Sequence, residues 1–206
     1  MRMRREQETL HDLPKLESYL KDLDLLPIEL MDKSILDLGA GGRQFAYECE
    51  RFGIPGVVSL DQSNESWMGI LRAIAQAQAM RKHSDVLASW ELVNAYTAQA
   101  EMQLLPFGDN TFDLVLSRHA LMPIQFTDET SFLSAYRELV RIVKPGGEAR
   151  IFPGLLEAWS KEQIEYAMKA LSVLDQIRGL QVTRTEVKTH IFGMSVRGSL
   201  IILRKQ

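Results

Sequence analysis

The chain has 206 residues, of which 46% are hydrophobic and 25% charged, and its net charge is −3. This composition is typical of a globular protein of one domain, and the charge argues against nucleic acid held by bulk electrostatics. The single cysteine, Cys49, excludes an internal disulfide and favours a reducing compartment, which for this chain we expect to be the cytoplasm. No apolar run approaches the roughly 20 residues of a membrane-spanning helix, so we expect no membrane association.

The N-terminal part is expected to hold one amphipathic helix. Residues 1–8 contain three arginines without an apolar stretch behind them, which predicts a flexible tail, with a partner-binding arm as the alternative. Residues 9–27 carry Leu16, Leu20 and Leu23 at helical spacing. This helix either packs on the core or covers a site as a lid.

From residue 34 onward, strand and helix patterns alternate along the chain. Cys49 lies on the apolar stripe of the first of these helices and is expected in the core, and the helix after the second strand has Trp67, Ile70, Leu71 and Ile74 on one face. Strands are predicted over 34–38, 56–61, 92–98, 112–117 and 148–153, and helices over 45–53, 129–143 and 160–179, the last capped by Ser160.

The last two apolar runs, 180–191 and 199–205, have no helix between them, so an antiparallel pair that adds to one sheet edge is expected. The fold class is therefore α/β: a doubly wound, mostly parallel seven-stranded sheet with an antiparallel C-terminal strand, in a single domain over residues 1–206. Its core would span 34–152, and 153–206 would supply the last helix and strands.

The turn after the first strand reads "ILDLGAGGRQF" over residues 35–45. Glycines at the carboxyl end of a buried strand let backbone approach a ligand closely. A dinucleotide fingerprint starting at Gly39 would need glycine where Gln44 stands, and no Gly-Lys-Ser/Thr follows for a phosphate-binding loop. Neither a nicotinamide cofactor nor ATP is the expected ligand.

The run from Asp37 to Gly41 resembles the first motif, D-x-G-x-G-x-G, of class I S-adenosylmethionine-dependent methyltransferases (of the type 11-like kind). Further segments resemble the same family in the same order: "VVSLDQS" (57–63), "AEMQLLPFGDNTFDLVLS" (100–117) and "ELVRIVKPGGEARI" (138–151). The resemblance covers residues 34 to 152 and implies S-adenosyl-L-methionine as the cofactor.

The resemblance also implies roles for individual residues. Asp61 would accept the ribose hydroxyls, although a strand-end cap is the alternative, and Glu101 would meet the adenine amino group unless it is only an exposed loop acid. Met102 would offer its backbone N–H to the adenine. The full set of residues implied to bind the cofactor is Asp37, Gly39, Ala40, Gly41, Asp61, Gln62, Glu101, Met102 and Ser117.

Methyl transfer from a sulfonium mainly requires that the reacting atoms be held in line. If the acceptor must lose a proton, His119, just past the fourth strand, is the candidate base; the alternative is that it only shapes the pocket. Asp113 is expected to be structural, and no His/Cys/Asp/Glu cluster has metal-ligand spacing, so no metal is expected. The apolar residues of 9–27, 122–127 and 153–160 favour a small, partly apolar substrate; the sequence leaves the oligomeric state open.

Arg43 stands where the family has its third glycine. Arginine has no need for positive φ, so we expect ordinary helical angles. Its guanidinium is expected to leave the turn, toward solvent, Glu48, Glu50 or the mouth of the pocket; the third alternative is that it fills the cofactor site. Two hypotheses follow: an active small-molecule methyltransferase, or a degenerate, non-catalytic methyltransferase fold that acts as a binding or partner subunit.

Overall fold

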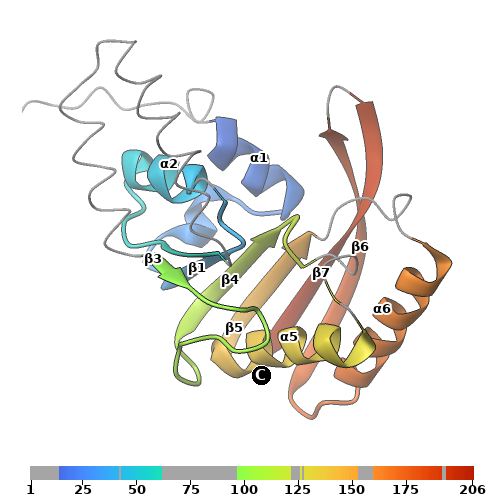
Figure 1. Cartoon of the computed structure of the whole chain (residues 1–206). Coiled ribbons are helices and arrows are strands. Elements are labelled where there is room, and N and C mark those ends of the chain that lie inside the picture. The colour runs from blue at the N-terminus through green and yellow to red at the C-terminus, as the bar shows by residue number, and fades with distance from the viewer. Residues whose placement is uncertain are drawn as a thin grey trace, which may run out of the picture.

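The computed structural model describes residues 14–41, 43–61, 97–121, 126, 128–152, 160–191 and 194–206. Seven strands in this part of the chain form one mixed sheet in the order β3-β2-β1-β4-β5-β7-β6 (Figure 1). Strands β1 to β5 are parallel to one another, and β7 runs antiparallel to both of its neighbours. The strands are β1 (Ile35–Leu38), β2 (Val58–Asp61), β3 (Thr97–Gln99), β4 (Phe112–Arg118), β5 (Val143–Phe152), β6 (Leu180–Ile191) and β7 (Met194–Lys205).

This architecture confirms the predicted fold class, including the antiparallel pairing of the last two strands. One detail differs. The final strand, β7, lies inside the sheet between β5 and β6, so the edge belongs to β6. Strand β5 also begins at Val143, earlier than the expected residue 148, because Val143 already pairs with Phe112 of β4; the Lys-Pro-Gly-Gly stretch that follows is an irregularity of the strand, with Gly146 at φ 79°.

Helices cover both faces of the sheet (Figure 1). Helices α1 (Pro14–Asp22) and α2 (Gln44–Phe52) pack on one face, and α5 (Glu129–Ile142) and α6 (Lys161–Leu174) on the other. Alternate residues of each buried strand serve the two cores. Leu36 and Val115 point to the α5 and α6 side, whereas Ile35 and Leu114 point to the α1 and α2 side.

The helix ends follow local sequence signals. Asp128 caps α5 by accepting a hydrogen bond from the Ser131 N–H at 2.8 Å, and Ser160 caps α6 in a capping box with Gln163. Gly53 ends α2 in a left-handed conformation. The predicted helix around Trp67 lies outside the described residues.

The N-terminal segment is anchored to β5 by a buried arginine. Arg150 donates hydrogen bonds to the carbonyl oxygens of Leu23, at 3.0 Å, and of Asp24, and forms an ion pair with Glu29 at 2.9 Å. These contacts satisfy backbone carbonyls just beyond the end of α1.

None of the helices in the described ranges has the length and apolar character needed to cross a membrane.

Candidate functional site

The turn after β1 is bound to the end of β2. The N–H groups of Gly39 and Ala40 donate to the Leu60 carbonyl at 2.8 and 3.1 Å. The Gly41 N–H donates to Oδ2 of Asp61 at 2.8 Å. The glycine turn and the acid that ends β2 therefore form one unit at the carboxyl edge of the sheet, where such sheets bind their ligands.

The two motif glycines serve different purposes. A Cβ added at Gly39, whose φ is 77°, would lie 2.0 Å from the Cβ of Ala120 and 3.8 Å from the Cε of Met102. Gly39 is thus required by the close approach of the segment after β4. A Cβ added at Gly41, with φ 52°, would meet no atom of the described residues within 4 Å, so this side of the turn is open in the described part of the chain.

Asp37 lies at the centre of the site and is fully buried. Its Oδ1 accepts a hydrogen bond from the Tyr19 hydroxyl at 3.1 Å, while its Oδ2 has no partner among the described residues. Burial raises the pKa of Asp37 to about 7, against the lowering effects of the Tyr19 hydrogen bond and the nearby Lys15. A buried carboxyl oxygen without a donor is unusual and suggests that a ligand supplies one.

Arg43 departs from the sequence-based expectation. Its φ is 57°, in the left-handed region, and only 4% of the residue is exposed. The backbone keeps the shape that the missing glycine would favour, and the guanidinium stays in the protein interior instead of reaching solvent. Burial lowers the pKa of Arg43, and attraction to Asp61 partly opposes this effect.

Two predicted residues lie at the end of β4. Ser117 is fully buried, and its hydroxyl has no partner among the described residues. His119 also has a positive φ, 63°; its N–H donates to the Phe152 carbonyl at 2.8 Å, and its ring meets that of Phe152 at 5.1 Å between centroids. Burial, followed by repulsion from Arg118, lowers the pKa of His119 to about 4. The imidazole is therefore neutral at pH 7, and it is a weaker base than an unperturbed histidine.

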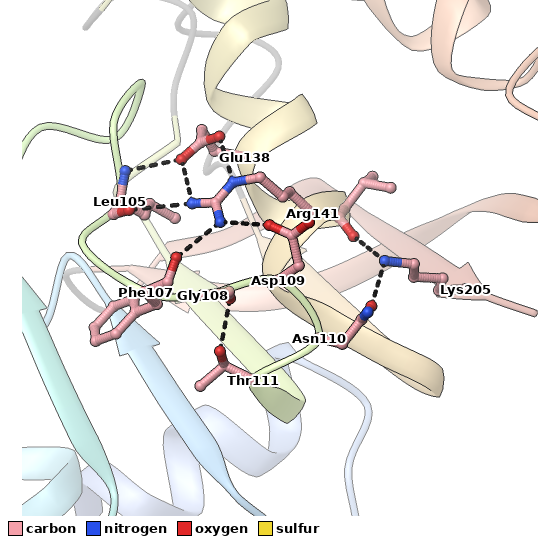
Figure 2. A network of polar contacts seen from close by, with 10 residues as sticks. Leu105, Phe107, Gly108, Asp109, Asn110, Thr111, Glu138, Arg141 and Lys205 are labelled. Atoms are coloured by element: carbon pink, nitrogen blue, oxygen red, sulfur yellow. Dashed lines mark hydrogen bonds and ion pairs between the residues drawn. The ribbon is translucent and has the colours of Figure 1, made fainter.

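The loop between β3 and β4 brings Glu101 and Met102 to the site. Met102 is buried next to Gly39, whereas the Glu101 side chain is exposed. Figure 2 shows how the far part of this loop is fixed. Arg141 of α5 donates to the carbonyls of Leu105 and Phe107 at 3.1 and 2.7 Å, and Glu138 accepts from the Leu105 N–H at 2.9 Å.

The structure brings most of the predicted residues together at the carboxyl edge of β1, β2 and β4. Gln62 lies outside the described residues. Asp113 lies at the opposite end of β4, where Ser34 and Lys144 hold it, in line with a structural role. Sequence reasoning missed Tyr19, although its place three residues after Leu16 puts it on the buried face of the predicted helix.

The family follows from a match over this same region. The family model described as "Methyltransferase domain" matches residues 36–151, which is more than half of the chain. The chain belongs to this family. It is a class I S-adenosylmethionine-dependent methyltransferase domain by sequence, motif order and fold.

Known proteins are similar over most of this methyltransferase domain. The ubiquinone/menaquinone biosynthesis C-methyltransferase UbiE of Francisella tularensis is 28% identical over 148 residues, covering 70% of this chain and 53% of the relative. The malonyl-[acyl-carrier protein] O-methyltransferase of a Marinomonas species is 28% identical over 172 residues, with coverages of 78% and 56%. The chain spans about half the length of these curated relatives.

A solved methyltransferase has the same fold. The crystal structure of an S-adenosylmethionine-dependent methyltransferase from Methanosarcina mazei superimposes with a TM-score of 0.58 at 17% identity, covering 88% of this chain and 98% of that one. At this identity the likeness concerns the fold alone.

The side chains of this methyltransferase domain fit the cofactor that the family implies. S-adenosylmethionine carries a cationic amino group, a ribose diol and an adenine. The Asp37 oxygen that no described residue donates to suits the cation, Asp61 at the end of β2 suits the diol, and no described atom fills the space beside Gly41. No group of three metal-ligating side chains occurs among the residues that the structure describes.

Proposed function

We propose that this protein transfers a methyl group from S-adenosylmethionine to a small, partly apolar acceptor. The observation that carries the proposal is the joint position of two acids. Asp61 is fixed by the Gly41 N–H, and buried Asp37 on the neighbouring strand β1 has one oxygen that no described residue donates to. Together they suit a ligand that pairs a ribose diol with an amino-acid cation.

Each residue of the candidate cofactor site then has a defined task. Asp61 accepts the ribose hydroxyls, and Asp37 accepts a hydrogen bond from the α-ammonium group. When bound, S-adenosylmethionine supplies an electrophilic methyl group whose leaving group is neutral. Around the ligand, the turn Gly39, Ala40 and Gly41 lies under the methionine part beside Ser117, and Gln62, Glu101 and Met102 surround the adenine.

His119 is the candidate general base. Its imidazole is neutral at pH 7 and free of a proton on one nitrogen, so it can accept one from the acceptor. Its ring contacts that of Phe152, and the apolar residues Ala120 and Leu121 follow it in the chain. This environment supports an acceptor with an apolar part. The relatives include a C-methyltransferase and an O-methyltransferase, and the acceptor atom of this protein stays open between such alternatives.

Calorimetry with S-adenosylmethionine, S-adenosylhomocysteine and NAD tests the cofactor. We expect both adenosyl compounds to bind and NAD not to bind. Asp61→Asn keeps an oxygen for the Gly41 N–H but removes the charge, and it should weaken binding by about 1.5–3 kcal/mol, the scale of a hydrogen bond to a charged group.

Asp175→Asn is the matched control, because Asp175 is an exposed acid in a surface ion pair with Arg184, away from the site. Its affinity for the cofactor should stay that of the wild type. Binding of NAD with neither adenosyl compound would refute the assignment, and a screen of acceptors with labelled S-adenosylmethionine then identifies the substrate.

One observation favours a second candidate, a non-catalytic binding subunit. Buried Arg43 places a cation near Asp61, where the ribose is expected. If the wild type binds neither adenosyl compound and Arg43→Gly binds both, the native site is blocked and the non-catalytic function is the better one.

A further inference from the structure

Tyr19 connects the N-terminal helix α1 to Asp37 in the candidate cofactor site. The residue is 3% exposed, and its ring stacks on that of Phe45 with 4.2 Å between centroids and an interplanar angle of 12°. Phe45 is the second residue of α2, immediately after the glycine turn. The ring of Tyr19 therefore packs on the segment that follows the turn, while its hydroxyl reaches Asp37 of β1.

The hydrogen bond from Tyr19 decides how the Asp37 carboxyl is presented. A carboxyl group on one flexible bond can rotate and exchange its oxygens unless a donor fixes one of them. Tyr19 occupies Oδ1 at 3.1 Å, and Oδ2 is left without a donor in the described part of the chain. Because leaving such an oxygen unsatisfied is unfavourable, the arrangement is complete only when a ligand donates to Oδ2.

Helix α1 also brings charge to this carboxyl. The Nζ of Lys15 lies 5.4 Å from the centre of the Tyr19 ring, and the guanidinium carbon of Arg118 lies 5.5 Å from it. Arg118 is itself held by Asp22 of α1 at 2.7 Å. Asp37 interacts electrostatically with titratable or charged groups from four elements, α1, α2, β2 and β4. These groups are Lys15, Tyr19, Cys49, Asp61 and Arg118.

We propose that Tyr19 is a positioning residue of the cofactor site, which holds Asp37 so that its second oxygen receives the α-ammonium group of S-adenosylmethionine. The inference rests on the proposed function. It makes α1 a part of the cofactor site and not a separate cover. By thermodynamic linkage, cofactor binding and docking of α1 then strengthen each other by the same factor.

The test compares two tyrosine variants of the full chain. Tyr19→Phe keeps the ring and its stacking but removes the donor to Asp37. Tyr136→Phe is the matched control, since Tyr136 is equally buried on the other face of the sheet and its hydroxyl has no partner among the described residues. In calorimetry we expect Tyr19→Phe to lower the affinity for both adenosyl compounds about tenfold and Tyr136→Phe to leave it unchanged.

A second readout separates positioning from mere packing. When a cation binds at Asp37, the carboxyl ionises, so binding below pH 7 should release a proton, measured as heat in buffers of different ionisation enthalpy. Tyr19→Phe removes an interaction that lowers the pKa of Asp37, so the release should extend to higher pH. Asp37→Asn should abolish the release, and adding Tyr19→Phe to it should cause no further loss of affinity.

The outcomes are distinct. Unchanged affinity and unchanged proton release in a folded Tyr19→Phe variant overturn the positioning role. An affinity loss that persists in the Asp37→Asn background also overturns it, because the effect then does not act through Asp37. Failure of the wild type to bind either adenosyl compound rejects the proposed function itself, and this inference with it. If Tyr19→Phe does not fold, the Asp37→Asn variant decides. Should this variant still release the proton that the wild type releases on binding, the proposal is refuted.

Discussion

Arg43 adopts a left-handed backbone conformation, which residues other than glycine, asparagine and aspartate rarely take. A left-handed position costs an ordinary residue roughly 1–2 kcal/mol. Here the residue also keeps its guanidinium inside the protein near Asp61. Both features make Arg43 a strained position next to a binding site, which is where such strain is concentrated in proteins.

Arg43→Gly should relieve the backbone strain and remove a cation from the neighbourhood of Asp61. Since the cofactor is itself cationic, we expect its affinity to rise about tenfold, the effect of one nearby partly buried charge. The melting temperature reports the relief of strain. Arg51→Ala, on the same helix but away from the turn, is the control. A loss of affinity in Arg43→Gly would mean that the guanidinium is a ligand of the cofactor carboxylate.

His119 has a left-handed backbone too, and this guides the choice of a variant. His119→Asn suits that conformation, because asparagine tolerates it, and removes the imidazole. If His119 is the base, turnover should fall by about 10²–10⁴-fold while cofactor affinity stays the same. With a pKa of about 4, the wild-type histidine should not by itself reduce the rate between pH 8 and pH 5. A loss of turnover below tenfold would assign His119 to the pocket wall.

The resemblance of the motifs to the methyltransferase family predicted Asp37, Gly39 and Asp61 at one site, because a strand, a tight turn and a strand end are local features that the motifs carry. It did not predict the contact of Gly39 with Ala120, which depends on how two distant segments meet. The angles of Arg43 were predicted wrongly, because the turn geometry overrides the preference of the residue.

At the scale of elements, periodicity predicted the helices best. Helix α5 was expected over 129–143 and ends at Ile142, and Gly53 ends α2 as expected. The start of β5 was missed because proline and glycine favour turns locally, whereas Val143, just before them, pairs with Phe112 of β4, and the strand resumes its pairing at Glu148 after a register shift. Strand pairing is a property of two segments, so one segment's composition does not determine it.

The loop between β3 and β4 depends on one residue of α5. Arg141 supplies hydrogen bonds to two loop carbonyls and to Asp109 (Figure 2). Arg141→Met should therefore lower the free energy of unfolding by about 1–3 kcal/mol, because it removes the donor to those acceptors and to Oε1 of Glu138, whose Oε2 keeps the Leu105 N–H. It should also weaken cofactor binding through the displaced Met102.

The control is Lys169→Met on α6. Its ion pair with Glu129 is exposed to solvent and is expected to contribute little to the stability. Denaturant unfolding measures both variants. Equal effects of the two substitutions would contradict the anchoring role of Arg141.

At the scale of the molecule, a half-buried histidine and a buried aspartate give the stability opposite pH dependences. The pKa of His119 is lowered from 6.5 to about 4, so its contribution is complete above pH 6.5 and is lost as the pH falls through 4. The pKa of Asp37 is raised from 3.8 to about 7, so its contribution is complete below pH 3.8 and is lost as the pH rises through 7.

Asp37→Asn isolates the second effect in the protein without cofactor. The stability of this variant relative to the wild type should increase from pH 5 to pH 7, by at most about 1.4 kcal/mol per pH unit, and level off above. Urea unfolding at several pH values measures the difference. A difference that does not change with pH would show that Asp37 has an ordinary pKa.

The inner position of β7 has a consequence for how the chain folds. The strand follows all other described strands in the chain, yet β6 reaches the sheet only through it. Strands β6 and β7 are neighbours in sequence and pair along their whole length, whereas β5 pairs with β7 over four residues only. Closing a short connection costs little conformational entropy, so we expect this hairpin to form as a unit and then to dock on β5. A mutation in β7 at Ile201 or Leu203 would therefore slow the docking of two strands at once. Until they dock, the parallel part of the sheet would have an exposed edge strand, which is prone to aggregation.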